Sequence, residues 1–230
     1  MDLLKLITTA GLVMAMSQSP INSSTDEVVG FAATSYISVI PEDVKSNMLG
    51  KTIKENSVVL LDDLRYLKIA YWGYDGEEHV GELIVNKLVA DEVLEIFAEL
   101  YDARYPIEKM CLPDEYGGND EESMQDNNTS AFNDRPISKK SLSYHQFGLA
   151  IDVNPLYNPY YNAKSKLVQP KTGKPYLDRT AEVSEFIRKD DICYNAFVSR
   201  GWSWGGDWTN PKDYQHFEKT TVIDIKALAR

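Results

Sequence analysis

The feature that most constrains the fold is a pair of apolar segments separated by a turn signal. Leu67–Tyr71 and Glu82–Val85 flank Tyr74-Asp75-Gly76-Glu77, and an Asp-Gly pair between such segments is a strong signal for a β-hairpin. Lys87–Tyr101 follows with apolar residues at three- and four-residue steps, which predicts an amphipathic helix closed by Pro106. Strands and helices do not alternate regularly along the chain, so we expect an α+β fold with an antiparallel sheet.

Later segments complete the predicted secondary structure. Asp114–Pro136 has no clear periodicity and is predicted to be a long irregular loop, of the kind that often carries function. Gly148–Asn154 alternates and predicts a short strand. Glu182–Arg200 predicts a helix that stops at the following glycine. The aromatic segment after that glycine is expected to end in a short strand near His216.

The N-terminus predicts a leader rather than part of the folded domain. Lys5 precedes the short apolar segment Leu6–Met16, and Ala15-Met16-Ser17 offers small residues at the spacing of a signal-peptidase site. An apolar first helix packed on the domain is the alternative. The segment is shorter than the ~18–20 residues that cross a bilayer, so we expect no integral membrane segment in the mature chain. The predicted organisation is a signal peptide over residues 1–17, a linker over 18–35 and one catalytic domain over 36–230.

Composition excludes some functions. The chain of 230 residues carries a formal net charge of −11, so it gains no counterion-release attraction to DNA or RNA, and nucleic acid is not an expected partner. Cys111 and Cys193 are the two cysteines. They are compatible with a disulfide or with two separate thiols.

The first motif with chemical potential surrounds His145. It reads Ser143-Tyr144-His145-Gln146-Phe147-Gly148-Leu149-Ala150-Ile151-Asp152. On a strand starting at Leu149, Ala150 and Asp152 point to one face. Gly148 allows a turn that folds His145 back over that face. An imidazole and a carboxylate would then converge, as a borderline metal such as zinc prefers.

The second motif is Asp213-Tyr214-Gln215-His216-Phe217. With His216 as a third ligand the metal set becomes two histidines and Asp152, which leaves the fourth tetrahedral position for water, as in catalytic zinc sites. Asp213 lies three residues before His216 and could act as general base and then general acid. The sequence therefore predicts a zinc hydrolase, with one Zn²⁺ per chain.

The order Ser-x-His-x-x-Gly-x-Ala-x-Asp followed by Asp-x-x-His resembles the zinc D-alanyl-D-alanine carboxypeptidase family. That family includes the vancomycin-resistance D,D-peptidases and phage L-alanyl-D-glutamate endopeptidases. Similar segments extend the resemblance: Asp126–Arg135 resembles the family's substrate-side loop, Trp202–Trp208 its Gly-Trp-x-Trp-Gly-Gly-Asp-Trp segment, and Asp63–Leu67 and Gly81–Asn86 are also similar. The likeness runs from about Tyr36 to the C-terminus. It implies a small antiparallel sheet that carries the zinc site and is flanked by helices, as in hedgehog and D-Ala-D-Ala peptidase folds.

The resemblance also implies roles for single residues. His145, Asp152 and His216 would bind zinc, and Asp213 would be the catalytic base. Arg135 would lie near the scissile carbonyl or the substrate carboxylate, a role that suits a permanently charged guanidinium; a surface ion pair is the alternative.

Further residues near these motifs are candidates with weaker signals. Ser143 could bind substrate or steady His145, and Trp204 could line the pocket or belong to the core. Gly205-Gly206 would let the backbone approach the substrate, and Asp207 would accept a hydrogen bond from a ligand histidine. His79 is expected to be a structural or surface histidine, because no second ligand type is paired with it in sequence.

The resulting hypothesis is an exported hydrolase of the periplasm or cell envelope. It would be a metallopeptidase acting on peptidoglycan stem peptides or muropeptides, with D,D-carboxypeptidase activity as the leading choice. An L-alanyl-D-glutamate endopeptidase shares the metal ligands and is one alternative. The other is a catalytically silent zinc-containing binding module like the hedgehog signalling domain, which the presence of Asp213 and Arg135 disfavours.

Overall fold

The computed structural model describes residues 30–135 and 142–223. The predicted signal peptide and most of the predicted linker lie outside the described residues, as does Pro136. Within the described ranges the chain forms a mixture of helices and small antiparallel sheets, which confirms the predicted α+β class.

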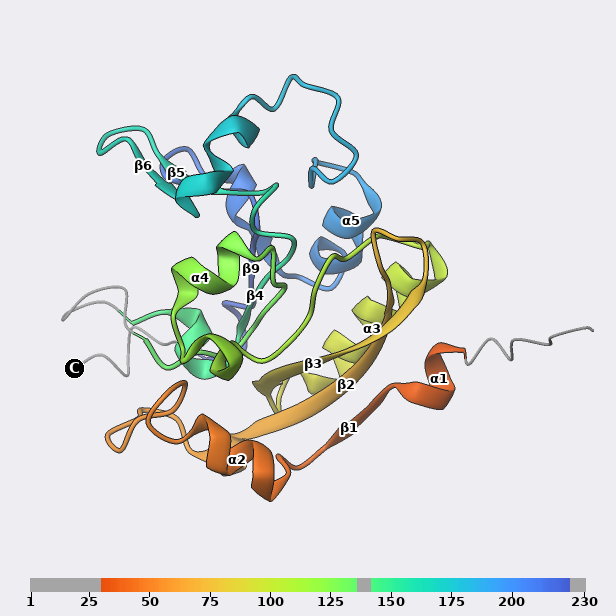
Figure 1. Cartoon of the computed structure of the whole chain (residues 1–230), viewed down its shortest axis with the longest axis vertical. Helices are drawn as coiled ribbons and strands as arrows, with labels where there is room; N and C mark the ends of the chain where they lie inside the picture. The colour runs from red at the N-terminus through yellow and green to blue at the C-terminus, as the bar shows by residue number, and fades with distance from the viewer. Residues whose placement is uncertain (1–29, 136–141, 224–230) are drawn as a thin grey trace, which may run out of the picture.

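The first sheet contains the predicted hairpin. Strands β1 (Tyr36–Ser38), β2 (Leu64–Trp72) and β3 (Glu78–Asn86) pair antiparallel in that order. Gly76 takes φ +79° in the turn, a conformation that L side chains rarely adopt. Figure 1 shows the hairpin curving along one flank of the molecule. The short elements around it are α1 (Phe31–Thr34), α2 (Glu42–Met48) and the 3-10 helix η1 (Leu61–Asp63).

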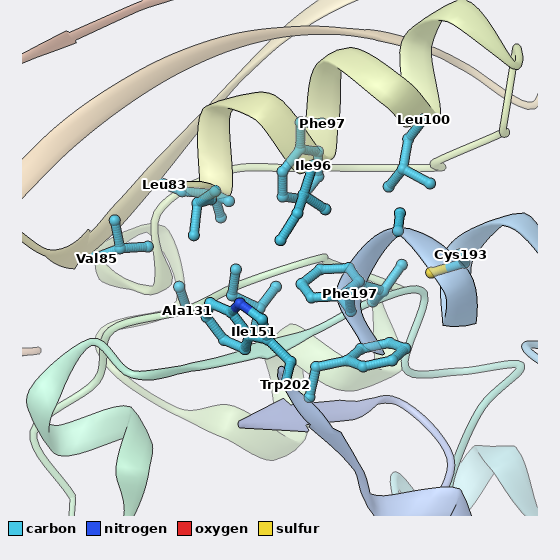
Figure 2. Packing of buried hydrophobic residues seen from close by; sticks show 14 of the residues in the cluster. Leu83, Val85, Ile96, Phe97, Leu100, Ala131, Ile151, Cys193, Phe197 and Trp202 are labelled. Atoms are coloured by element: carbon cyan, nitrogen blue, oxygen red, sulfur yellow. The ribbon is translucent and has the colours of Figure 1, made fainter. Parts of the chain in front are cut away.

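The main hydrophobic core packs against one face of this hairpin. Helix α3 (Ala90–Asp102) confirms the predicted amphipathic helix and begins three residues after Lys87. Its Ile96, Phe97 and Leu100 are buried and face Phe197 of helix α5 (Ile192–Val198) (Figure 2). Burial of one such side chain stabilises the fold by about 1.5–3 kcal/mol, so α3 holds the hairpin onto the rest of the domain.

The predicted helix over Glu182–Arg200 is wrong for its first half. Only α5 (Ile192–Val198) is α-helical, and the preceding ten residues form short turns joined by irregular segments. Asp190 takes φ +67°, which interrupts a right-handed helix. Asp191 then starts α5 as its N-cap, with a side-chain oxygen that accepts from the backbone N–H of Tyr194 at 2.7 Å.

The prediction of an irregular loop over Asp114–Pro136 is wrong in part. The 3-10 helix η2 (Pro113–Tyr116) enters the segment, and the α-helix α4 (Asp120–Gln125) follows. Asn119 is the N-cap of α4 and accepts from the N–H of Glu122 at 3.4 Å. A helix of six residues covers fewer than two turns, which is too short for a readable apolar period.

The later strands of the described residues form two further three-stranded sheets. Strand β9 (His216–Glu218) lies between β4 (Ala150–Asp152) and β7 (Ser203–Trp204), and β5 (Tyr160–Asn162) lies between β6 (Leu167–Gln169) and β8 (Lys212–Asp213). The short strands predicted within Gly148–Asn154 and near His216 are confirmed. Three 3-10 helices complete this part: η3 (Tyr144–Phe147), η4 (Lys171–Leu177) and η5 (Gly205–Asp207). In Figure 1, β4 and β9 lie between the β2–β3 hairpin and the β5–β6 hairpin.

The open question of the cysteines is resolved by their placement. Cys193 is buried on α5 in the main core (Figure 2), whereas Cys111 is half-buried, and both are free thiols. Among the described residues, no helix has the length and apolar character needed to cross a membrane.

Candidate metal centre

His145 is presented by a tight turn that the end of the hairpin holds in place. Ser143 caps η3 and accepts from the N–H of His145 at 3.2 Å, and the Gln146 side chain accepts from the N–H of Ser143 at 3.0 Å. Gly148 then takes φ +64°, and a Cβ there would lie 2.6 Å from the backbone nitrogen of Asn86. Only glycine allows this close approach, and it directs His145 back over β4.

Asp152 and His216 face each other across two antiparallel strands. The register of β4 and β9 pairs them directly, and side chains of directly opposed residues lie close together on one sheet face. The distance from His216 Nδ1 to an Asp152 oxygen is 3.0 Å, and from His145 Nε2 to the other Asp152 oxygen 3.3 Å. Two segments far apart in sequence thus bring three donors to one point.

These three residues fit the ligand set of a small divalent cation. One donor atom from each lies within 4.8 Å of the others, and all three side chains are buried. The facing nitrogens, His145 Nε2 and His216 Nδ1, are 3.2 Å apart. Zn–N bonds of 2.0–2.1 Å in a tetrahedral site place two nitrogens about 3.3 Å apart, so the spacing matches zinc without rearrangement.

Both histidines have an acceptor for the ring nitrogen that faces away from this point. His145 Nδ1 lies 2.6 Å from the Ala131 carbonyl oxygen, and His216 Nε2 lies 3.3 Å from a Glu218 carboxylate oxygen. Such acceptors set which ring nitrogen keeps its lone pair for a metal. Asp207, the acceptor expected from the sequence, instead accepts from the Tyr194 hydroxyl at 3.3 Å and is exposed.

The proton affinities of Asp152 and His216 are shifted by the groups around them. Burial disfavours the charged form of Asp152, but His145 and His216 outweigh it and hold its pKa below the usual range. Burial likewise disfavours a charged His216, but hydrogen bonds with Asp152 and Glu218 raise its pKa to about 10. The site is therefore built to hold positive charge, whether as a proton or as a metal ion.

Asp213 lines the same cavity as the three converging residues. The cavity has a volume of 520 Å³, a size typical of small-molecule and peptide sites. Burial raises the pKa of Asp213; His216 opposes this and Asp152 adds to it. A Cβ on Gly205 would lie 2.5 Å from the Asp213 carbonyl oxygen, so this glycine lets η5 pack against the strand that carries Asp213.

Arg135 brings a positive charge to the lining of this cavity. Its guanidinium forms an ion pair with Asp120 at the start of α4. Asp120 also accepts from the Asn133 side-chain amide at 2.7 Å. Burial lowers the pKa of Arg135, and the charges of Asp152 and Asp213 counter this. Both the substrate-side and the surface-pair interpretations of Arg135 thus have a counterpart in the structure, because one arginine lines the cavity and pairs with α4.

The remaining candidates divide between the cavity and the core. Ser143 lines the cavity, but Trp204 does not: its ring stacks with Phe217 in the core, and its Nε1 donates to the Tyr214 carbonyl. The structure instead places Trp208 in the cavity wall, where its ring centroid lies 5.6 Å from that of His216.

Gly205, Gly206 and His79 have packing roles. A Cβ on Gly206 would meet the Trp204 ring at 2.2 Å, so together the two glycines serve close packing within the domain. His79 pairs with Asp75 at 2.9 Å beside the hairpin turn and stacks on Tyr71, outside the cavity.

Further residues that reasoning from sequence missed contribute to the site. Glu218 and Tyr160 line the cavity, and Asp120 holds Arg135. The signal for Glu218 was present, since it lies two residues after His216 and strand alternation returns it to the same face. Tyr160 and Asp120 carried no such signal, because the β5–β8 pairing and α4 bring them in from distant segments.

One of the comparisons with known proteins gives a match. Residues 137–219 match the model of a family described as D-alanyl-D-alanine carboxypeptidase. The matched segment contains His145, Asp152, Asp213 and His216, while Arg135 lies just before it. Neither a curated protein nor a solved structure matches the chain. The family match confirms the resemblance seen in the motifs and supports a peptidase that acts on peptidoglycan.

Proposed function

We propose that this chain is a zinc metallopeptidase that hydrolyses peptide bonds in peptidoglycan stem peptides, as a D-alanyl-D-alanine carboxypeptidase. The observation that carries the proposal is the convergence of His145, Asp152 and His216 at one end of a cavity that Asp213 also lines. A ligand triad with an adjacent carboxylate is what metal-assisted hydrolysis requires.

Zinc is the metal that this donor set suits. Two imidazole nitrogens and one carboxylate oxygen form a borderline ligand set, and three protein ligands leave a position for water or substrate. The Ala131 carbonyl lies 2.6 Å from His145 Nδ1, which leaves His145 Nε2 to face the cavity. A zinc ion bound there would act as a Lewis acid and lower the pKa of a water molecule to about 7.

Asp213 is proposed to move the proton. Burial raises the pKa of Asp213 towards neutral pH. A group whose pKa lies near the working pH can both accept and release a proton during turnover. Asp213 would take a proton from the attacking water and give it to the nitrogen of the leaving D-alanine. Gln215 donates to an Asp213 oxygen at 3.3 Å, which orients the carboxylate.

Arg135 is proposed to bind the C-terminal carboxylate of the substrate. A guanidinium presents five N–H donors in a plane, so pairing with Asp120 does not exhaust its capacity for a second carboxylate. Ser143 and Trp208 line the same cavity and would contact the peptide. Trp204 would support the cavity wall from the core, where its ring packs against Tyr194 and Phe217.

This activity implies a place outside the cytoplasm. Peptidoglycan stem peptides are exposed in the cell envelope, and a signal peptide over residues 1–17 would direct export there. The linker over 18–35 and a single catalytic domain over 36–230 complete this proposal. Its partners would be muropeptides or stem peptides.

The test is to incubate the purified protein with a muropeptide that ends in D-Ala-D-Ala and to follow the products by mass spectrometry. We expect one zinc per chain and the loss of a single D-alanine. His145→Ala should abolish both, while His79→Ala serves as the matched control, because His79 lies outside the cavity.

The other outcomes separate the alternatives. A cut after L-Ala would replace the carboxypeptidase by an L-alanyl-D-glutamate endopeptidase with the same metal centre. Zinc binding without cleavage of any wall peptide would favour a binding module. Protein that binds no zinc would contradict the proposal.

A further inference from the structure

The two histidines of the metal centre differ in what holds them from behind. His145 is backed by the Ala131 carbonyl, a neutral acceptor, at 2.6 Å, whereas His216 is backed by the Glu218 carboxylate at 3.3 Å. The proposed function does not depend on this difference between the two acceptors. The difference raises the question of what a charged acceptor does on the His216 side of the site.

Glu218 is held in this position by the strand that carries His216. Residues two apart on β9 point to the same face, and Glu218 pairs with Ala150 of β4 on one side and with Ser203 of β7 on the other. Its side chain is only 16% exposed. A carboxylate with a fixed backbone and little solvent has few competing partners, so its interaction with His216 is favoured over water.

Glu218 is one of several charged groups around the His216 ring. Asp152 lies on the Nδ1 side at 3.0 Å, His145 Nε2 lies at 3.2 Å, and Asp213 acts from the cavity. Among the described residues, His216 Nε2 hydrogen-bonds to the Glu218 carboxylate at 3.3 Å. The carboxylate thus acts on the nitrogen that faces away from Asp152 and His145.

We propose that Glu218 is a positioning residue that fixes the metal-binding tautomer of His216 and strengthens its bond to the metal. With Nε2–H donating to Glu218, the lone pair of His216 is confined to Nδ1, the atom that faces His145 and Asp152. The negative charge also makes the imidazole more basic and hence a stronger ligand. His145 lacks this charge, so the two histidines contribute unequally to metal affinity.

This inference rests on the proposed function, because it assumes that the triad binds zinc. Outer-shell partners of ligand histidines typically change metal affinity 10–100-fold. Glu218→Gln keeps an acceptor oxygen and nearly the same shape but removes the charge. Glu218→Ala removes both, so the pair separates the effect of charge from that of hydrogen bonding.

The experiment measures the zinc dissociation constant of the full chain by competition with a chromogenic chelator at neutral pH. We expect zinc binding to weaken about tenfold in Glu218→Gln and up to about 100-fold in Glu218→Ala. The exposed Glu55→Gln is the matched control for loss of one negative charge, and it should bind zinc as the wild type does. The visible spectrum of the Co²⁺-loaded proteins should shift in the two Glu218 variants and not in the control.

The outcomes distinguish this inference from the function on which it rests. Equal zinc affinity and equal Co²⁺ spectra in wild type and both Glu218 variants would overturn the inference and leave the metallopeptidase intact. A wild-type protein that binds no zinc would overturn both. Circular dichroism and thermal unfolding without metal show whether the variants fold, and the Gln variant carries the test if the Ala variant does not.

Discussion

The β2–β3 hairpin with α3 and the metal centre are two regions of one domain that are stabilised in different ways. In the hairpin region, stability comes from apolar side chains such as Leu67, Phe97 and Leu100, which are buried almost completely. In the metal centre, buried positions hold His145, Asp152 and His216, which compensate each other electrostatically. The hairpin region needs no ionic partner, whereas the centre holds a buried carboxylate, Asp152, whose positive partner is a protonated histidine or, in our proposal, a metal ion.

The two regions meet at Asn86, the last residue of β3. Its backbone N–H donates to the Gly148 carbonyl at 2.8 Å, and its side-chain amide donates to the Phe147 carbonyl at 3.0 Å. These bonds pin the turn that carries His145 to the end of the hairpin. The hairpin therefore acts as the rigid support for a site whose own residues are selected for chemistry rather than packing.

The largest expected effect separates activity from stability within the metal centre. Asp213→Asn removes the proton-transfer group without changing its shape, so we expect peptidase activity to fall by about 10²–10⁴-fold. Thermal stability should stay nearly the same, because no apolar contact is lost. Initial rates on the muropeptide and a melting curve check this. Retention of most of the activity would show that another group transfers the proton.

The converse change in the hairpin region should affect stability most. Phe97→Ala removes a buried ring that packs against Phe197 at 6.4 Å between centroids, and we expect a loss of about 3–5 kcal/mol in the free energy of unfolding. Urea unfolding measures this, with and without a chelator. Val80→Ala on the exposed side of β3 is the matched control and should change stability by less than about 0.5 kcal/mol. A loss that depended on the metal would break the comparison between the regions.

A pH-dependent effect should appear in the metal centre of the metal-free protein. The folded-state pKa of His216 is raised to about 10, whereas an unfolded histidine titrates near 6.5. A raised pKa means that charged His216 stabilises the fold fully below about pH 6.5, and that this contribution is lost as the pH rises towards 10.

The measurement compares urea unfolding of the metal-free wild type and His216→Gln between pH 6 and pH 10. The difference in unfolding free energy should shrink as the pH rises, and zinc affinity of the wild type should increase over the same range, because the metal displaces the proton. A difference that stayed constant with pH would contradict the assignment.

The smallest expected effect concerns the link between α4 and the cavity. Asp120→Asn keeps the shape but weakens the ion pair with Arg135, which is 37% exposed. Pairs of this exposure contribute about 0.2–1 kcal/mol, so we expect KM to rise by no more than about fivefold with kcat unchanged. Steady-state kinetics with Glu115→Gln as an exposed control checks this. A fall in kcat alone would mean that Asp120 acts on the reaction rather than on substrate placement.

Features that depend on residues close together in the sequence could be predicted, whereas features that depend on contacts between distant segments could not. The hairpin and α3 are local, so an Asp-Gly turn and a repeating apolar step were enough to predict them. The triad could also be proposed, because His145 and Asp152 share one motif and His216 brings its own Asp-x-x-His pattern. Their roles as ligands stay a prediction until metal binding is measured.

The features that sequence did not predict depend on tertiary contacts. Apolar residues such as Phe186 and Ile187 suggested a longer helix. They are buried, but they lie in an irregular segment, and the Arg179 guanidinium stacks on the Phe186 ring at 3.7 Å. Tyr160 enters the cavity because β5 pairs with β8, and Trp204 leaves it because its ring joins the core. The identity of an aromatic residue does not show whether distant segments of the chain will cover it in the core or leave it in the cavity.

The measurement that tests the central claim most directly is an anomalous difference map at the zinc absorption edge, from crystals of the full chain grown with zinc. The account predicts a peak within about 2.0–2.2 Å of His145 Nε2, His216 Nδ1 and one Asp152 oxygen, and its loss in His145→Ala. A well-ordered triad with no anomalous peak between its three side chains, at zinc concentrations that saturate binding elsewhere, would contradict the assignment of this site as a metal centre.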